Sequence, residues 1–191
     1  MKANYIGGEW VGSDAASRNI NPSNTDDVID EFARAGRDQV AAAIDAAVAA
    51  FPGWSRSVPL KRHDILKTIG DELTARAQEL GRQLSREEGK ILPEGIGEVM
   101  RAGQIFHFFA GECLRIPGER MDSVRPGVDV EITREPLGVV GLITPWNVPV
   151  VIPAWKIAPA LADGNCGVFK PADLTPASAH ALAEIISRAG L

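Results

Sequence analysis

The chain has 191 residues, of which 45% are hydrophobic and 24% charged, a composition typical of a globular protein that is long enough to bury a core. Its formal net charge is -5 and no run of Lys and Arg exceeds two residues, which argues against nucleic acid or an anionic membrane surface as a partner. No apolar run reaches the length of a membrane span, and the N-terminus lacks the apolar segment of a signal peptide.

Residues 1–124 are predicted to begin with strands and to continue as helices. Tyr5-Ile6 and Glu9–Val11 flank Gly7-Gly8, a pair suited to a tight turn, and Val28–Ala33 can form another strand. Apolar spacing and cap residues then predict four helices. These helices begin at Asp38, Pro59, near Leu80 and at Pro93, and the first, third and fourth end at Pro52-Gly53, Gly89 and Leu114. We expect Val40, Ile44, Val48 and Phe51 to form the buried face of the first helix, and Glu87-Glu88 to be a solvated helix end.

The pattern changes at Arg125-Pro126-Gly127, where a strand with one exposed face is predicted over residues 128–133 from strict apolar and polar alternation. Residues 138–144 and 165–170 are short apolar runs, typical of strands buried on both faces. Between them lies a predicted helix over residues 150–161, so the order is that of a βαβ unit. Thr175 and Pro176 are expected to open a last helix. Two parallel strands do not make a stable sheet alone, so we expect the chain to be cut at its C-terminus.

The turn Thr144-Pro145-Trp146-Asn147 follows the first strand of this unit, at the edge where α/β sheets hold ligands. Two prolines, Pro145 and Pro149, restrict its backbone, so the Asn147 amide would be held rigidly and could donate to a developing oxyanion. Asparagine is also among the best helix N-caps, and Asn147 could serve only that role. Both interpretations remain open from the residues alone.

Lys170 ends the second strand of the unit and is followed closely by Asp173. A lysine and a carboxylate at this edge could bind the ribose hydroxyls of a nucleotide, or they could be an exposed ion pair. No glycine-rich phosphate loop is present, because Gly95-x-Gly97 follows no strand and continues to Met100 where a small residue is needed.

The two cysteines, Cys113 and Cys166, follow no metal spacing, and we expect them to be core residues with free thiols, in a cytoplasmic setting. His63, His107 and His180 have no partner at metal or triad spacing. The sequence therefore predicts no metal site.

Three C-terminal segments, ITPWNVP, AWKIAPALADGN and VFKPADLTP, strongly resemble the aldehyde dehydrogenase superfamily, and IGGEW, NPSN, AFPGW and FFAGE precede them in that family's order. The resemblance implies an α/β fold, the N-terminal portion of an aldehyde dehydrogenase, with a Rossmann-like cofactor domain incomplete at its C-terminus. It implies an N-terminal hairpin and helical part over 1–124, an oligomerisation strand over 125–137 and the start of the cofactor-binding βαβ unit over 138–191. It also implies oxidation of an aldehyde to an acid with NAD(P)⁺, through attack by a cysteine and hydrolysis of a thioester by glutamate-activated water.

Carried over by position, the resemblance implies that Asn147 is the oxyanion donor. The residues implied to contact the cofactor are Ile143, Thr144, Pro145, Trp146, Asn147, Lys170, Ala172 and Asp173. Asp173 stands where many members have glutamate, so its carboxylate reaches one methylene less far. Val148, where phenylalanine is usual, and Trp155 are implied to lie on the substrate side.

Arg101 is a further substrate candidate, because Arg is suited to a bidentate grip on a distal carboxylate. It lies one and two turns before Ile105 and Phe108, and we interpret these three residues as one stripe that is otherwise apolar. An ordinary surface arginine is the alternative.

REEGK, GQIF, FFAGE, SVRPG and KPADLTP most resemble α-ketoglutarate semialdehyde dehydrogenases, with succinate semialdehyde and generic aldehyde dehydrogenases as alternatives. NAD or NADP is the implied cofactor, with a slight preference for NAD because the Asp173 carboxylate would repel a 2′-phosphate. The implied partners are a small aldehyde and further copies of the chain, as a dimer or tetramer. The family's nucleophilic cysteine and general-base glutamate belong beyond Leu191, so the chain alone is expected to be inactive. A truncated, non-catalytic fragment that binds nucleotide or a partner subunit is the other class of function.

Overall fold

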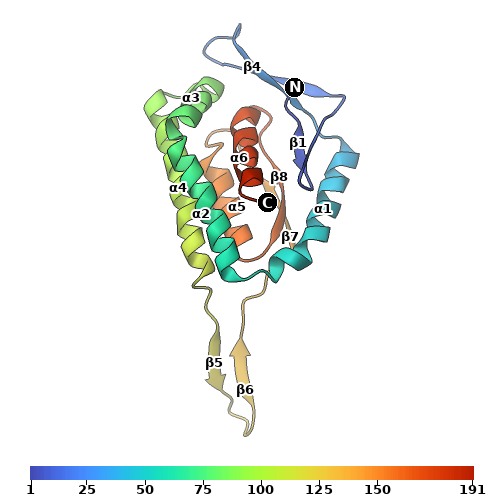
Figure 1. Ribbon diagram of the computed structural model, residues 1–191, viewed down its shortest axis with the longest axis vertical. Helices are drawn as coiled ribbons and strands as arrows, with labels where there is room; N and C mark the ends of the chain where they lie inside the picture. Colours follow the sequence, from blue (N-terminus) through green and yellow to red (C-terminus); the bar gives the residue numbers. More distant parts are fainter.

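The computed structural model describes residues 1–191, with six helices and four pairs of strands (Figure 1). Three pairs are antiparallel, and they are β1 (Asn4–Ile6) with β2 (Glu9–Val11), β3 (Ala16–Ile20) with β4 (Val28–Ala33), and β5 (Glu119–Asp122) with β6 (Asp129–Ile132). The fourth pair is parallel, β7 (Val139–Ile143) with β8 (Cys166–Lys170). The helices are α1 (Arg37–Ser55), α2 (Pro59–Ala75), α3 (Ala77–Glu88), α4 (Leu92–Cys113), α5 (Val151–Ala162) and α6 (Pro176–Arg188).

Local sequence signals explain most of these boundaries. Gly7 and Gly8 have positive φ angles of 61° and 88°, which glycine adopts at little cost in the turn between β1 and β2. Pro59 occupies the first turn of α2, where its missing N–H costs nothing. Gly89 ends α3 in the left-handed region with a φ of 84°. The predicted βαβ order is also confirmed, with α5 connecting the parallel strands β7 and β8.

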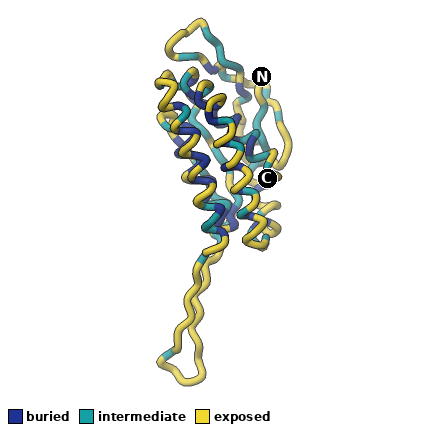
Figure 2. Tube along the Cα trace, turned by 60° about the vertical axis from the view of Figure 1, so that its left-hand side comes forward, coloured by how far each residue is buried: buried dark blue, intermediate teal, exposed yellow.

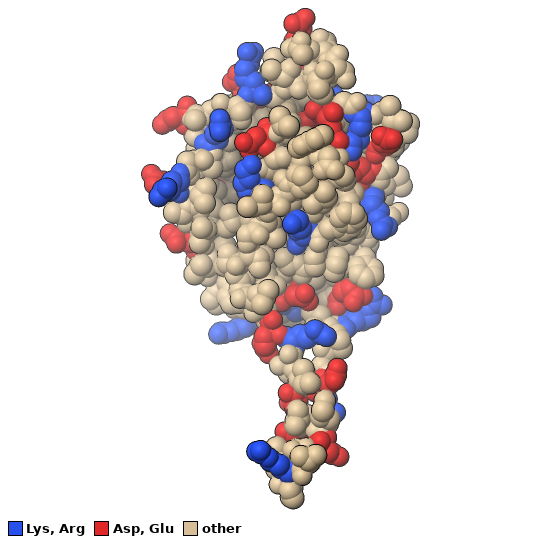
Figure 3. Space-filling view, turned by 180° about the vertical axis from the view of Figure 1, so that it is seen from behind, with Lys and Arg blue, Asp and Glu red and all other residues tan.

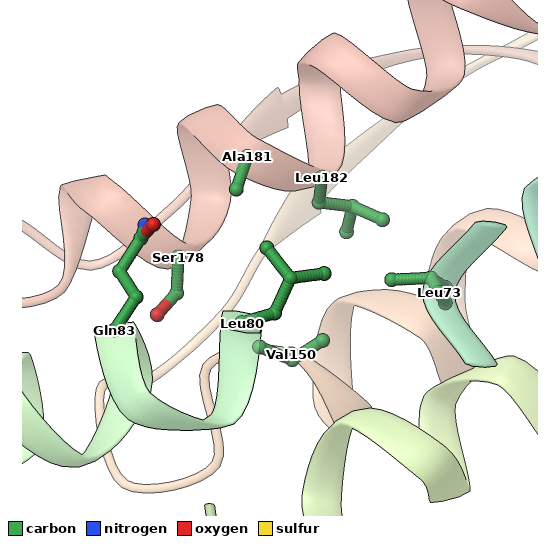
Figure 4. Close-up of a pocket in the computed structure, with 7 residues that line it drawn as sticks. All are labelled: Leu73, Leu80, Gln83, Val150, Ser178, Ala181 and Leu182. Atoms are coloured by element: carbon green, nitrogen blue, oxygen red, sulfur yellow. The ribbon is translucent and has the colours of Figure 1, made fainter. Parts of the chain in front are cut away.

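The hydrophobic core lies between helices. In Figure 1, α2, α3 and α4 form a layer on one side, α5 and α6 pack against it, and the β7–β8 pair lies between these helices and α1. The largest fully buried apolar side chains are Phe106, Leu66, Ile69, Leu73, Leu84, Leu182, Ile185 and Val99. A cavity of about 10 Å³ remains between α2, α3, α6 and the start of α5 (Figure 4). It has room for roughly one water molecule and none for an organic ligand.

The structure corrects the prediction for α1. The helix begins at Arg37 after Gly36, not at Asp38, and it continues through Pro52 to Ser55. Its expected buried face is largely in solvent, since Val40, Ile44 and Val48 are 45%, 45% and 55% exposed. The helix packs instead through Ala47 and Trp54, because small alanines allow close approach to the strands.

The structure also corrects the burial expected for β7 and β8. Neither strand contains a fully buried residue, and Ile143 is 72% exposed. Only two strands are present, so each has an unpaired edge and part of their faces is left uncovered. Apolar runs of this kind are typical of strands that are buried on both faces within a wider sheet.

The β5–β6 hairpin extends away from the rest of the molecule (Figures 1 and 2). All its strand residues are exposed, on both faces, which differs from the single exposed face predicted for residues 128–133. Strand β5 was not predicted, and residues 124 and 125, a predicted domain boundary, both lie in the turn of this hairpin. Acidic and basic side chains both lie along it (Figure 3), including the Arg120–Asp129 pair at 2.8 Å. No helix in the structure combines the length and the hydropathy required of a bilayer span.

Candidate functional site

The two strands of the parallel pair bring the predicted cofactor residues to one edge. Ile143 lies opposite Lys170 in the register, so the segments that follow both strands leave the sheet side by side. The Thr144 N–H donates to the Lys170 carbonyl at 3.3 Å, which extends the ladder one residue into the turn. Residues 143–148 and 170–173 thus lie next to each other at the carboxyl end of the strands, where α/β folds hold ligands.

Most of the turn after β7 is open to solvent. Thr144 is buried at 5% exposure, whereas Pro145, Trp146 and Asn147 are all exposed, Trp146 by 52%. Val148 is half-buried and packs against the hydrophobic core. Asn147 is therefore available to a ligand, while Thr144 before it and Val148 after it anchor the turn.

Asn147 is not a helix cap. Helix α5 begins at Val151, four residues after Asn147. Its N-cap residue is Val150, whose side chain cannot accept a hydrogen bond. The cap comes from α4, where Glu98 Oε1 accepts from the N–H groups of Val150 at 2.9 Å and Val151 at 3.3 Å. The alternative interpretation of Asn147 was thus wrong, and its side chain has no hydrogen bond within the chain.

A lysine from the α3–α4 connection completes the support of the turn. Lys90 Nζ donates to Glu98 Oε2 at 2.5 Å, lies 2.9 Å from Glu88 Oε2, and donates to the Asn147 carbonyl at 3.4 Å. All three ionisable side chains are at most 15% exposed. Burial raises the pKa of the Glu88 carboxyl, and the two carboxylates raise the pKa of the Lys90 ammonium against the opposing effect of burial.

Lys170 and Asp173 form an ion pair at 2.7 Å, with side chains 59% and 71% exposed, and half-buried Ala172 lies between them in the sequence. The lysine lowers the pKa of the Asp173 carboxyl through their hydrogen bond. An exposed donor beside an exposed acceptor suits vicinal hydroxyls such as those of a ribose, so these residues fit a nucleotide. The ion pair and the predicted ribose contact do not exclude each other, because both groups keep unused hydrogen-bonding capacity.

The substrate candidates Arg101 and Trp155 are both exposed, Trp155 by 52%, and they come from α4 and α5 respectively. Arg101 Nη1 donates to Gln104 Oε1 at 3.2 Å, one turn along its own helix. The predicted stripe is divided, because Ile105 is 5% exposed and faces the core, whereas Phe108 is 58% exposed. Within the chain, no hydrogen bond joins either candidate to the Asn147 turn.

Neither cysteine has the surroundings of a nucleophile. Cys113 is buried at 2% exposure on α4 and Cys166 is half-buried on β8, and burial raises the pKa of both thiols. Both are free. Among the histidines, His107 Nε2 lies 2.9 Å from Asp71 Oδ1 on the helical surface, and His180 packs against Trp10.

Sequence reasoning missed the role of two buried glutamates. Glu87 was expected in solvent, but it is 3% exposed and accepts from the N–H groups of Ala177 at 2.6 Å and Ser178 at 2.8 Å, at the start of α6. Thr175, the expected cap, makes no side-chain cap bond. A signal existed for Glu87 and for Glu98, since each lies three or four residues from apolar or small residues of its own helix. A carboxylate inside such a stripe must find buried donors.

Residues 10–191 match the model of the aldehyde dehydrogenase family. The chain is 42% identical over 190 residues to an α-ketoglutarate semialdehyde dehydrogenase of Haloferax volcanii, covering 98% of this chain and 39% of that protein. It is 41% identical to a 2,5-dioxopentanoate dehydrogenase of Saccharolobus solfataricus, covering 96% of this chain and 38% of that protein.

Among solved structures, a betaine aldehyde dehydrogenase double mutant from Staphylococcus aureus in complex with NAD⁺ matches with a TM-score of 0.96 and 34% identity. This match covers 100% of the chain and 39% of the solved one. The residues described thus span about two fifths of the length of the proteins they resemble, and the α/β fold corresponds to an N-terminal portion of theirs.

Proposed function

Since the chain belongs to the aldehyde dehydrogenase family, we propose that it supplies the cofactor edge and the oxyanion donor for NAD(P)⁺-dependent oxidation of an aldehyde to a carboxylic acid. α-Ketoglutarate semialdehyde is the proposed substrate, supported by the names of the two relatives at 42% and 41% identity. Succinate semialdehyde or another aldehyde is the alternative within the same chemistry. We place the reaction in the cytoplasm, because both thiols are free.

The observation that carries the proposal is the exposed Asn147 amide beside an exposed nucleotide-compatible edge. Its N–H₂ group can donate to an aldehyde oxygen while that oxygen gains negative charge. The restricted backbone of the turn keeps the donor in place before the reaction, so little reorganisation is required. The bound cofactor would supply the hydride acceptor.

The remaining residues of this edge would bind the cofactor in two ways, through hydrogen bonds to its ribose and through contacts along the protein backbone of the turn. Lys170 can donate to a ribose hydroxyl and Asp173 can accept from one, while the exposed Ile143, Pro145 and Trp146 would contact the cofactor, with Thr144 buried behind them. The Asp173 carboxylate disfavours a 2′-phosphate, so we propose a preference for NAD⁺. Comparable kcat/KM values for NADP⁺ would overturn this preference.

The nucleophile of this chemistry is proposed to lie outside residues 1–191. Burial disfavours the thiolate form of Cys113 and Cys166, and neither belongs to the turn or to the loop after β8. We therefore propose that residues 1–191 alone do not oxidise aldehydes, and that they act within a longer enzyme that assembles as a homo-oligomer. A non-catalytic fragment that binds nucleotide is the second candidate, and NAD⁺ binding without turnover by any longer form would favour it.

Replacement of the oxyanion donor tests the proposed function. In the complete enzyme, Asn147→Ala should lower kcat by roughly 10²–10³-fold, because one preorganised donor is lost. The Kd for NAD⁺ should change little, since Lys170 and Asp173 are untouched. Steady-state kinetics and NAD⁺ titration measure both quantities. An unchanged kcat would remove Asn147 from the reaction.

Replacement of the candidate carboxylate-binding residue tests the proposed substrate. Arg101 is exposed and its guanidinium is held only by Gln104, so it is free to grip a distal carboxylate in two contacts. Arg101→Met in the complete enzyme should raise KM for α-ketoglutarate semialdehyde and leave KM for an uncharged aldehyde of equal length unchanged. Equal losses on both aldehydes would assign Arg101 to the fold alone.

A further inference from the structure

The peptide backbone around Asn147 depends on very few side chains. Within residues 144–151, every hydrogen bond that a side chain makes to the backbone comes from Lys90 or Glu98. Pro145 and Pro149 limit φ at two positions, but they have no backbone N–H and so donate no hydrogen bond. No other side chain therefore forms a hydrogen bond that fixes the position of the exposed Asn147.

Glu98 holds the segment just after Asn147. Its two oxygens are divided between partners, with Oε1 accepting from Val150 and Val151 and Oε2 accepting from Lys90. The side chain is only 5% exposed. A carboxylate buried to this degree is tolerated only where its partners are fixed, so the first turn of α5 and the ammonium are fixed by the same group.

Lys90 holds the segment at Asn147 itself. The Lys90 ammonium donates hydrogen bonds to Glu98 Oε2 and to the Asn147 carbonyl, and Glu88 Oε2 lies 2.9 Å away as a further ion-pair partner. The Asn147 peptide group is thereby tied to the end of α3 and to α4, two elements of the core layer.

We propose that Lys90 and Glu98 are positioning residues. Through their hydrogen bonds to the backbone at Asn147 and at the start of α5, they set the orientation of the Asn147 amide toward the reacting carbonyl. This inference rests on the proposed function for its catalytic consequence, although the positioning itself can be measured without turnover. Both residues contact only the backbone of this segment, not the Asn147 side chain. Loss of either should misdirect the oxyanion donor and leave the Lys170–Asp173 edge intact.

The chain contains a matched control. Glu87 also accepts from two backbone N–H groups at a helix start, as well as from the Ser178 hydroxyl, and is also buried, but it serves α6, in another part of the fold. Glu87→Gln therefore reproduces the loss of a buried cap without disturbing the Asn147 turn. Lys90→Arg keeps the positive charge that Glu88 and Glu98 need, while the guanidinium places its donors elsewhere.

The first measurement is solution NMR of the 191-residue chain. The side-chain NH₂ signals of Asn147 are identified by their loss in Asn147→Ala. Lys90→Arg and Glu98→Gln should shift these signals and lower the ¹⁵N heteronuclear NOE of residues 145–148, whereas Glu87→Gln should change neither. Folded Lys90→Arg and Glu98→Gln chains with unmoved Asn147 signals would overturn the inference, whatever the activity.

The second measurement is kinetic and uses the complete enzyme. Lys90→Arg should lower kcat by up to roughly 10²-fold, the scale of a small misplacement of a reacting group, with KM for NAD⁺ unchanged. Combined with Asn147→Ala it should add less than twofold further loss, since the donor it positions is gone. Fully additive losses would overturn the positioning role with the proposed function intact. A parent enzyme without aldehyde oxidation would instead overturn the proposed function and leave the NMR result to decide the positioning.

Discussion

At the scale of single residues, the starts of α5 and α6 are both capped by glutamates from other helices, Glu98 and Glu87. A distant carboxylate does more than a local cap, because it joins two helices while it satisfies free N–H groups. The cost is burial of an acid. Burial raises the pKa of the Glu87 carboxyl, although Ser178 and Ala177 oppose this effect through their hydrogen bonds.

We expect Glu87 to make stability depend on pH. Its pKa is raised in the folded chain, so its contribution is fully present below the ordinary glutamate value of 4.5 and is lost as pH rises through the folded pKa. The free energy of unfolding of the parent minus that of Glu87→Gln should therefore fall between pH 4 and neutral pH. Urea titrations of both chains at several pH values measure the difference. A difference that rises with pH would show that the hydrogen bonds outweigh burial.

At the scale of elements, the helix layer is built on close approach at glycines. A Cβ on Gly81 of α3 would lie 2.7 Å from the backbone N and Cα of Ile96, so α3 and α4 touch there with no room for a side chain. Gly103 and Gly70 make a similar contact between α4 and α2. Gly97, also on α4, is exposed and has no atom within 4 Å of its ideal Cβ position. Gly81 of α3 therefore has no space for a side chain, whereas Gly97 of α4 does.

Alanine substitution should separate these two demands. Gly81→Ala forces backbone apart and should destabilise the chain by about 1–3 kcal/mol, as overpacked cores do. Gly97→Ala meets no neighbour and should stabilise it by up to about 1 kcal/mol, because alanine loses less backbone entropy in a helix. Chemical denaturation of the two variants provides the comparison. Equal effects of the two substitutions would show that α3 can move away from α4 without cost.

At the scale of the whole molecule, the β5–β6 hairpin has no core of its own. A two-stranded ribbon with Val128, Val130 and Ile132 each at least 36% exposed is marginal in water. Exposed apolar side chains on a paired ribbon are typical of a surface that is buried by another copy. The hairpin therefore supports the homo-oligomer proposed for the complete enzyme.

The hairpin can be tested by changing one of its faces. Val130→Asp with Ile132→Asp should reduce the complete enzyme to a smaller assembly, because two charges would have to be buried in the contact. Glu131→Gln, on the alternate face of the same strand, is the control and should keep the oligomer. Light scattering after size exclusion reports the mass. An unchanged mass for the double aspartate variant would place the subunit contact elsewhere.

The sequence by itself determined the start of α2 at Pro59, the end of α3 at Gly89 and both ends of α4 to within one residue, and it determined the βαβ order with a polar turn at the carboxyl end of β7. These features depend on local chemistry. Proline at a helix start, glycine at a helix end, and apolar spacing all act within a few residues. The family was also evident from the ITPWNVP and VFKPADLTP segments, and the match over residues 10–191 confirms it.

The tertiary structure alone decided what surrounds these elements. It showed that Glu98 and Glu87 cap α5 and α6 and that Lys90 donates to the Asn147 carbonyl. The sequence could not predict these contacts, because partners more than 50 residues apart produce no periodic pattern in the chain. It also showed Val40, Ile44 and Val48 in solvent, since an apolar face predicts burial without naming what buries it. Hydrogen bonds and burial depend on which elements meet, and only the folded chain brings those elements together.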